Sequence, residues 1–283
     1  MSDLSLDFNL HEKQLEVFKS KARFRVLMAG RRFGKSYLSK VELVVAGLKT
    51  EDSKGRSLRD KHIWYVAPTY GQAREIMWEP LKDAARPVTV KKSERDMWIE
   101  LVTGRRIYVK GADNPDSLRG RGISDMVIDE FDAMKSNIWD LVLMTTLADV
   151  GGRALFIGTP APGGSIKEFY ERGQSDEFPE WESWRFSSRD NPTLAQQDID
   201  IMKSVMSDAA FRQEVEADPD ATSGGALDVS CMKFAPSAPT AGVRVITIDL
   251  AGFTDNSSVL GTGKRKNRND ESAIACVEIT KEG

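Results

Sequence analysis

The sequence of 283 residues has few of the residues on which disulfide-rich and zinc-dependent proteins rely. It contains two cysteines, Cys231 and Cys276, and two histidines, His11 and His62. The cysteines have neither the density of a disulfide-stapled fold nor the spacing of metal ligands, so we expect both thiols to be reduced. The histidines are far apart and no Ser-His-Asp signature accompanies them, which argues against a hydrolase triad or a zinc site.

Long apolar runs are absent as well. No stretch approaches the roughly 18 apolar residues that a membrane-spanning helix needs. The N-terminal sequence MSDLSLDFNL also lacks the basic-then-apolar order of a signal peptide. The sequence therefore predicts an intracellular protein with no membrane partner.

An excess of positive charge is missing too. The formal net charge is -3, whereas DNA-binding proteins usually carry clustered Lys and Arg. The stretches GKRKNRN (263–269) and RGRG (119–122) are locally basic, but short runs of this kind are more often solvated loops. A role in DNA binding therefore has to be argued from other features.

The chain does contain a regular alternation of strand and helix signals. Apolar runs predict strands at 24–28, 62–69, 125–130 and 153–160, with helices at 36–48, at 70–85 before Pro87, and at 135–148. Residues 98–111 predict a hairpin that turns at Thr103-Gly104. Continuous apolar strands that alternate with helices indicate an α/β fold, in which a mostly parallel sheet has helices on both faces.

The composition changes after residue 217. Residues 218–242 are rich in Ala, Ser, Pro and Gly and are typical of a linker. Beyond it, VRVITIDLAG and SAIACVEI predict two strands of another domain. The expected organisation is therefore one domain over 1–217, a linker over 218–242 and part of a second domain over 243–283.

The octapeptide AGRRFGKS (29–36) ends like a phosphate-binding loop, although Ala29 replaces the usual first glycine. In Gly34-Lys35-Ser36, backbone N–H groups at a helix N-terminus attract phosphate, the lysine neutralises the β- and γ-phosphates, and the serine hydroxyl binds Mg²⁺. An isolated GKS is more often an ordinary helix start. Here it follows a predicted strand and opens a predicted helix, which favours an ATP site.

A second signal is the apolar strand that ends in Asp129 and Glu130. In an ATPase of this type the first acid holds the Mg²⁺ shell, and the second orients or deprotonates the attacking water. Adjacent acids also occur in surface loops and at helix starts. Together with GKS about ninety residues upstream, they predict a P-loop NTPase of the ASCE type.

These motifs resemble those of the large terminase subunits of tailed double-stranded DNA bacteriophages, the ATP-driven motors that package genomes. That family has a deviant phosphate loop with an arginine near its start. The resemblance implies that Arg31 is a catalytic arginine and Arg32 a less favoured alternative. It also implies that the whole loop contacts ATP, namely Ala29, Gly30, Arg31, Arg32, Phe33, Gly34, Lys35 and Ser36.

The resemblance extends to segments on both sides of the loop. Gln14, in His11-Glu12-Lys13-Gln14, matches the glutamine that reads adenine, although a helix-surface role stays open. Val66-Ala67-Pro68-Thr69 with Gln72 is similar to the second strand-end motif. Ile157-Gly158-Thr159-Pro160 resembles the coupling motif, in which Thr159 would sense the γ-phosphate.

The turn Ser117-Leu118-Arg119-Gly120 runs directly into the acidic strand, as it does in many terminases. There Arg119 matches an arginine that some members supply to the ATP of a neighbouring subunit, which contributes about 10³ to 10⁵ in rate. The alternative is a loop arginine paired with Asp113 or Asp116.

The segment after the linker is similar to the start of the family's nuclease domain, which has a ribonuclease-H-like fold. Asp249 would be its first metal-binding aspartate, with residues 243–283 supplying only the first hairpin. Two-metal cleavage with Mg²⁺ or Mn²⁺ needs carboxylates from several strands. We therefore expect an incomplete nuclease site in these 283 residues.

The resemblance implies an ATPase that uses Mg²⁺ and moves double-stranded viral DNA into a procapsid. Its expected partners are DNA, the portal protein, the small terminase subunit and further copies of itself in a ring. Its expected location is the host cytoplasm and, transiently, the procapsid portal. Two alternatives stay open at this point: another DNA-dependent P-loop ATPase such as a helicase, and a catalytically silent assembly module.

Overall fold

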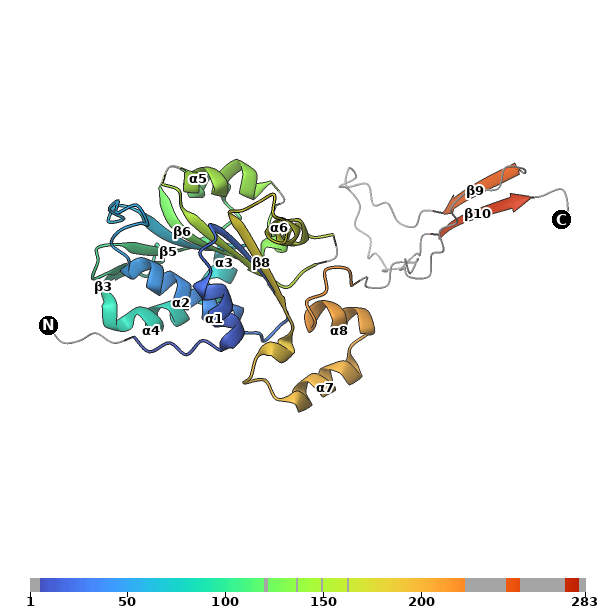
Figure 1. The fold of residues 1–283 in the computed structure, drawn as a ribbon, viewed down its shortest axis with the longest axis horizontal. Coiled ribbons are helices and arrows are strands. Elements are labelled where there is room, and N and C mark those ends of the chain that lie inside the picture. The colour runs from blue at the N-terminus through green and yellow to red at the C-terminus, as the bar shows by residue number, and fades with distance from the viewer. Residues whose placement is uncertain are drawn as a thin grey trace, which may run out of the picture. The chain divides into compact units, whose positions relative to one another are not determined.

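The computed structural model describes residues 6–119, 122–135, 137–148, 150–161, 163–221, 243–249 and 273–279. The chain divides into two compact units, Met1–Ala221 and Thr222–Gly283 (Figure 1). The first unit is built around a sheet of eight strands, and the second contains a pair of strands. In the described ranges, no helix is both long and apolar enough to cross a membrane.

The large sheet has the strand order β3-β4-β5-β2-β6-β7-β1-β8. From β5 to β8 all neighbours are parallel, whereas β3, β4 and β5 are joined in antiparallel fashion. The mostly parallel α/β sheet that the sequence predicts is therefore confirmed. The strands in chain order are β1 (Phe24–Ala29), β2 (His62–Ala67), β3 (Thr89–Ser93), β4 (Trp98–Leu101), β5 (Arg106–Gly111), β6 (Ile123–Asp129), β7 (Arg153–Gly158) and β8 (Trp181–Phe186).

Helices cover both faces of this sheet. Successive residues of each strand point to opposite faces, so neighbouring residues pack in different cores. Leu27 packs in one core with α1 (Glu12–Lys19), α2 (Lys35–Leu48) and α4 (Glu79–Ala85). Its neighbour Val26 packs in a second core, with the helical segment Trp139–Ala148 that includes α5 (Met144–Ala148) and with α6 (Ile166–Gly173). Burial on both faces explains why the strands are continuously apolar in sequence.

The elements expected from the pattern are present, with small changes at their ends. The helix expected at 70–85 consists of α3 (Tyr70–Ala73), a π-helical turn (Arg74–Trp78) and α4, and a 3-10 turn that contains Pro87 follows it. Gly104 in the β4–β5 turn has φ +78°, a conformation that glycine adopts without strain. The pattern did not reveal β3, β8 or α6.

Two further helices were also missed: α7 (Gln196–Val205) and α8 (Asp208–Glu214). They form a small cluster around Ile199, Phe211 and Val215 that is separate from the two cores of the sheet. This first unit extends to Ala221, which is buried. The rest of the expected linker lies outside the described residues.

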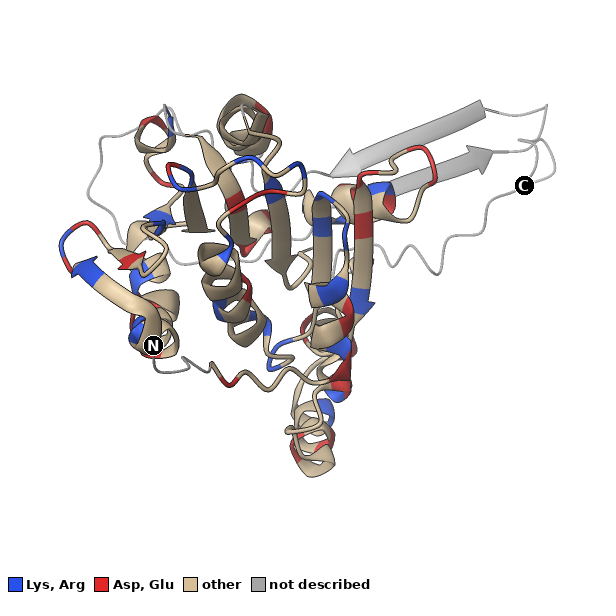
Figure 2. Ribbon diagram, turned by 60° about the vertical axis from the view of Figure 1, so that its left-hand side comes forward, with Lys and Arg blue, Asp and Glu red and all other residues tan. Residues whose placement is uncertain are grey.

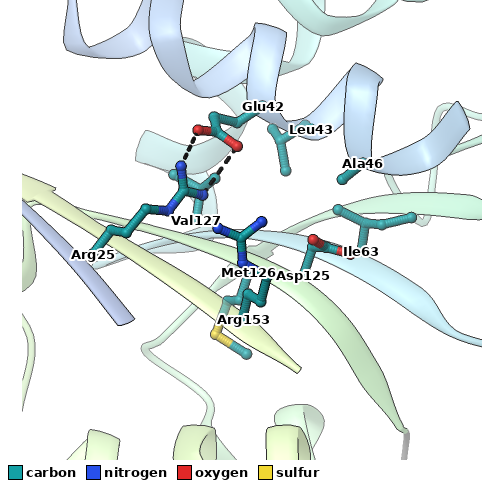
Figure 3. Close-up of a pocket in the computed structure, with 9 residues that line it drawn as sticks. All are labelled: Arg25, Glu42, Leu43, Ala46, Ile63, Asp125, Met126, Val127 and Arg153. Carbon is teal, nitrogen blue, oxygen red and sulfur yellow. Dashed lines mark hydrogen bonds and ion pairs between the residues drawn. The ribbon is translucent and has the colours of Figure 1, made fainter. Parts of the chain in front are cut away.

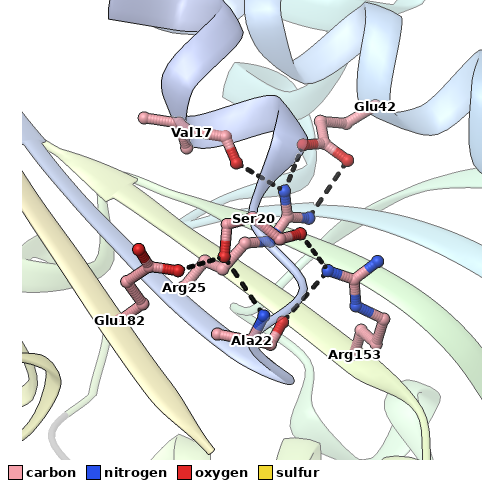
Figure 4. Close-up of polar contacts among 7 residues, drawn as sticks. All are labelled: Val17, Ser20, Ala22, Arg25, Glu42, Arg153 and Glu182. Atoms are coloured by element: carbon pink, nitrogen blue, oxygen red, sulfur yellow. Dashed lines mark hydrogen bonds and ion pairs between the residues drawn. The ribbon is translucent and has the colours of Figure 1, made fainter.

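The amino ends of the central strands carry a buried charge network below α2. Arg25 of β1 donates two hydrogen bonds to the carboxylate of Glu42 on α2 (Figure 3). Arg153 of β7 donates to the carbonyl oxygens of Ser20 at 2.9 Å and Ala22 at 3.0 Å (Figure 4). The Arg25 bonds join α2 to the amino end of β1, and the Arg153 bonds join the loop before β1 to the amino end of β7. Together they hold β1, the strand that leads into residues 29–36.

Charges of both signs are interspersed along the ribbon (Figure 2), which agrees with the small net charge. In the second unit, β9 (Val243–Asp249) and β10 (Ala273–Ile279) pair in antiparallel fashion, with Asp249 opposite Ala273. The two strands expected after the linker are thus confirmed. The basic stretch GKRKNRN and the central part of RGRG lie outside the described residues.

Candidate active site at the carboxyl ends of three strands

Three adjacent parallel strands bring the predicted site residues to one edge of the sheet. The predicted phosphate-binding loop follows β1, Asp129 ends β6, and Thr159 follows β7, which lies between the other two strands. Because carboxyl ends of parallel strands meet at the same edge, residues more than a hundred positions apart come together. In the sheet, β1 and β6 are separated by the single strand β7.

Two glycines shape the loop. Gly34 precedes α2 with φ +100°, in the left-handed region that suits glycine. Gly30 is required by close approach: a Cβ there would lie 2.3 Å from the carbonyl oxygen of Val215 and 2.5 Å from Ser188 Oγ. Ala29, which occupies the first position of the usual motif, is a buried residue of β1. The loop therefore has glycine at the two positions where a Cβ would clash or the backbone is left-handed, Gly30 and Gly34.

Lys35 is the best-anchored cation of the site. Its Nζ donates to the carbonyl oxygen of Ala29 at 2.7 Å, to that of Gly30 at 3.2 Å and to Thr159 Oγ1 at 2.9 Å. Burial lowers the pKa of the Lys35 ammonium, and the nearby Glu130 and Asp129 carboxylates oppose this effect. The contact between Lys35 and Thr159 places the predicted sensor residue beside the predicted phosphate ligand.

The acidic pair has two different environments. Asp129 is 3% exposed and accepts a hydrogen bond from the Tyr65 hydroxyl. Burial raises the pKa of Asp129 to about 6, with Glu130 adding to the rise and the Tyr65 hydrogen bond and Lys35 opposing it. Glu130 is less buried than Asp129. Its backbone has φ +49° and ψ +51°, a left-handed conformation that residues other than glycine rarely adopt.

Ser36 lies in the first turn of α2, directly after Lys35. Among the described residues its hydroxyl has no hydrogen-bond partner, whereas Ser39 donates to the Lys35 carbonyl oxygen at 2.9 Å. A free serine hydroxyl and a buried aspartate are oxygen ligands of the kind that Mg²⁺ prefers. The side chains of Ser36 and Asp129 therefore suit a magnesium site.

The two loop arginines differ in their contacts. The guanidinium of Arg31 forms an ion pair with Glu214 of α8, its side chain is 72% exposed, and this pair raises the pKa of Arg31. Arg32 is exposed and has φ +65°. Neither role predicted for these arginines is tested by this geometry, but the pair ties Arg31 to a helix that the sequence pattern missed.

Two of the predicted ATP-binding residues also hold the loop in place. Gln14 is 3% exposed; its Nε2 donates to the carbonyl oxygen of Gly34 at 2.9 Å, and its Oε1 accepts from the backbone N–H of His11 at 3.1 Å. Phe33 is buried and stacks on Phe186 with a centroid distance of 5.4 Å. Gln14 is thus not a helix-surface residue, and its role toward adenine stays a prediction.

Residues between 188 and 214 support the loop from outside, and the sequence pattern did not predict these contacts. Ser188 Oγ donates to the Arg31 carbonyl oxygen at 2.6 Å, and Asn191 Nδ2 donates to that of Arg32 at 2.6 Å. The backbone N–H of Arg31 donates to the Glu214 carbonyl oxygen at 2.7 Å. No local signal marks these contacts, because the segment lies some 150 to 180 positions away from the loop.

Among the described residues, Arg119 makes no hydrogen bond or ion pair with this cluster. Arg119 Nε lies 3.5 Å from Asp116 Oδ1, and its side chain is 56% exposed, which matches one of the alternatives weighed for it. Asp249 ends β9 in the other unit, and its side chain lies outside the description. The described residues contain no group of three or more His, Cys, Asp or Glu that could hold a metal, and the nuclease role of Asp249 stays a prediction.

Comparison with known proteins agrees with this geometry. The family model described as "Terminase large subunit, T4likevirus-type, N-terminal" matches residues 26–234, which is more than half of the chain. The chain belongs to this terminase family. A terminase large subunit of Escherichia phage T5 is 31% identical over 201 residues, which are 69% of this chain and 44% of that protein. Another, from Thermus phage G20c, is 25% identical over 315 residues, covering 96% of this chain and 63% of the relative.

This terminase chain thus spans less than two thirds of the length of either curated relative. Among solved structures, it is similar to the large terminase ATPase domain of Thermus phage P74-26, with a TM-score of 0.64 and 25% identity over 75% of this chain and 94% of that one. The large terminase of a thermophilic bacteriophage, solved in complex with ATP-gamma-S, has a TM-score of 0.60 at 18% identity, covering 72% of this chain and 51% of that one. The fold class is therefore that of terminase ATPase domains.

Proposed function

We propose that this chain binds and hydrolyses Mg²⁺·ATP and that hydrolysis drives movement of double-stranded viral DNA into a procapsid. The observation that carries the proposal is the convergence of Lys35, Thr159 and Asp129 at the ends of three adjacent strands. Membership of the terminase family and likeness to a terminase ATPase domain support it. The solved complexes of a similar terminase with ATP-gamma-S and with ADP support nucleotide as the ligand.

Each residue of the site has a task in this proposal. Backbone N–H groups of Gly34 to Ser36 at the start of α2 and the Lys35 ammonium bind the β- and γ-phosphates. Ser36 and Asp129 hold Mg²⁺, which neutralises charge on the phosphates. Glu130 orients the attacking water and accepts its proton, while Thr159, bonded to Lys35, responds to the γ-phosphate.

The arginines and Gln14 complete the nucleotide site in the proposal. Arg31 stabilises charge on the transferred phosphoryl group from within its own subunit, which requires it to leave Glu214. Gln14 offers its remaining donor and acceptor capacity to the adenine edge while it holds Gly34. Arg32, whose carbonyl oxygen is held by Asn191, is the less favoured arginine.

The remaining proposals concern the larger protein. We take residues 1–217 as the ATPase domain, 218–242 as a linker and 243–283 as the first part of a ribonuclease-H-like domain. There Asp249 would be one of several ligands for Mg²⁺ or Mn²⁺. In the proposal, the motor works as a ring of copies on the procapsid portal in the host cytoplasm, with the small terminase subunit delivering DNA.

Two measurements on the 283-residue chain test the proposed function. Steady ATP turnover that requires Mg²⁺ is expected, and a catalytically silent assembly module would bind ATP without turning it over. A forked duplex with a fluorescent strand should stay paired during turnover, because a packaging motor moves along duplex DNA. ATP-dependent strand separation would identify a helicase instead.

Arg119 offers a test of assembly. We propose that it acts on the ATP of a neighbouring subunit, so Arg119→Ala subunits mixed with Lys35→Ala subunits should recover part of the turnover that each variant lacks alone. In such a mixture an intact Arg119 can face an intact Lys35 site. The measurement is turnover across mixing ratios, with ring formation checked by light scattering. Absence of recovery in confirmed rings would contradict the proposed role.

A further inference from the structure

Tyr65 is a buried polar group at the candidate site that the proposed chemistry does not use. It lies on β2, where it is paired in register with Val127 of β6, and it is 0% exposed. Its ring packs in the core beneath α2, together with Leu27 and Ile63. Its hydroxyl reaches along β6 to the strand end and donates to Asp129 Oδ2.

This hydrogen bond engages one of the two oxygens of the Asp129 carboxylate. Within the described residues, Tyr65 is the only side chain that donates a hydrogen bond to Asp129. A carboxylate can rotate about its terminal bond, and both oxygens are then equivalent toward a cation. Oδ2 is held by Tyr65, whereas Oδ1 has no side-chain donor among the described residues and can face the cation or a water bound to it.

We propose that Tyr65 is a positioning residue for the Mg²⁺ of the bound nucleotide, acting by fixing the orientation of the Asp129 carboxylate. The inference rests on the proposed function, because Asp129 matters to a cation only if Mg²⁺·ATP binds there. Mg²⁺ requires near-ideal octahedral geometry and gives up its waters reluctantly, so a carboxylate fixed in advance binds it better than a rotating one. Outer partners of metal ligands typically contribute about 10–100-fold in metal affinity.

Tyr65→Phe isolates the hydroxyl, because phenylalanine retains the ring that packs in the core. We expect the dissociation constant for Mn²⁺, measured by electron paramagnetic resonance in the presence of ADP, to rise about 10-fold. ADP affinity in EDTA should stay unchanged, because among the described residues the Tyr65 hydroxyl bonds to Asp129 and not to the loop at 29–36. ATP turnover should fall at low Mg²⁺ and recover as Mg²⁺ is raised.

Tyr108→Phe is the matched control. Tyr108 lies on the neighbouring strand β5, is 5% exposed and packs in the core on the other face of the sheet. Loss of its hydroxyl should leave Mn²⁺ affinity unchanged, and thermal melting of both variants reports whether each is folded.

The outcomes separate the inference from the proposed function. Unchanged Mn²⁺ affinity in folded Tyr65→Phe would overturn the positioning role while leaving the ATPase proposal intact. A loss of ADP affinity in EDTA would also overturn it, because the hydroxyl would then support the fold of the whole site. If the unmodified chain bound neither ADP nor Mn²⁺, the proposed function itself would fail.

Discussion

Replacing Lys35 with alanine is expected to lower ATP turnover by at least about 100-fold, the scale found when one preorganised group is removed from a charge-stabilising site. The Lys35 ammonium donates to the carbonyl oxygen of Gly30 in the loop and to the hydroxyl of Thr159, the predicted γ-phosphate sensor. Its charge is held where the β- and γ-phosphates would lie in the proposed complex. ATP affinity should fall as well, because part of this attraction is already present before the reaction.

The measurement compares turnover and ATP binding of Lys35→Ala with those of Lys40→Ala. Lys40 lies on the same helix, and its ammonium is 4.3 Å from the ring centroid of Tyr37 rather than in the loop. Removal of Lys40 should have little effect on either quantity. Turnover within a few-fold of normal in Lys35→Ala would show that the loop does not bind the phosphates as proposed.

Glu130→Gln should lower turnover by a similar or larger factor while ATP still binds. General-base groups typically contribute about 10²–10⁴-fold, and glutamine keeps the size of glutamate without its ability to accept a proton. Glu130 has the strained backbone with φ +49° at the end of β6. Such strain persists where the surrounding structure enforces it, and it is common at active sites.

Single-turnover hydrolysis and equilibrium ATP binding separate the two effects in Glu130→Gln. Glu171→Gln on α6 serves as the control, since it removes a carboxylate outside the three strand ends. If Glu130→Gln hydrolysed ATP at a near-normal rate while binding Mg²⁺·ATP, another group would have to act on the attacking water.

The sequence alone was sufficient for the parts of the site that are local in the chain. Gly34-Lys35-Ser36 follows an apolar strand and opens a helix, and Asp129-Glu130 ends another apolar strand. Both signals depend on residues within about ten positions, because strand and helix periods are read over such windows. The same local signals predicted the central strands of the sheet and the helices between them. These strands are β1, β2, β6 and β7.

Only the tertiary structure decided which distant side chains complete the site. Tyr65 meets Asp129 because β2 and β6 are neighbours in the sheet, and Glu214 meets Arg31 because α8 returns to the loop 183 positions further along the chain. The elements in this part of the chain are short, with 6 residues in β8 and 7 in α8, and the local pattern did not reveal either of them. Strand order and register are set by the packing of the whole core rather than by any single segment. For that reason the local pattern singled out residues 29–36 and the two acids but not the distant side chains that contact them.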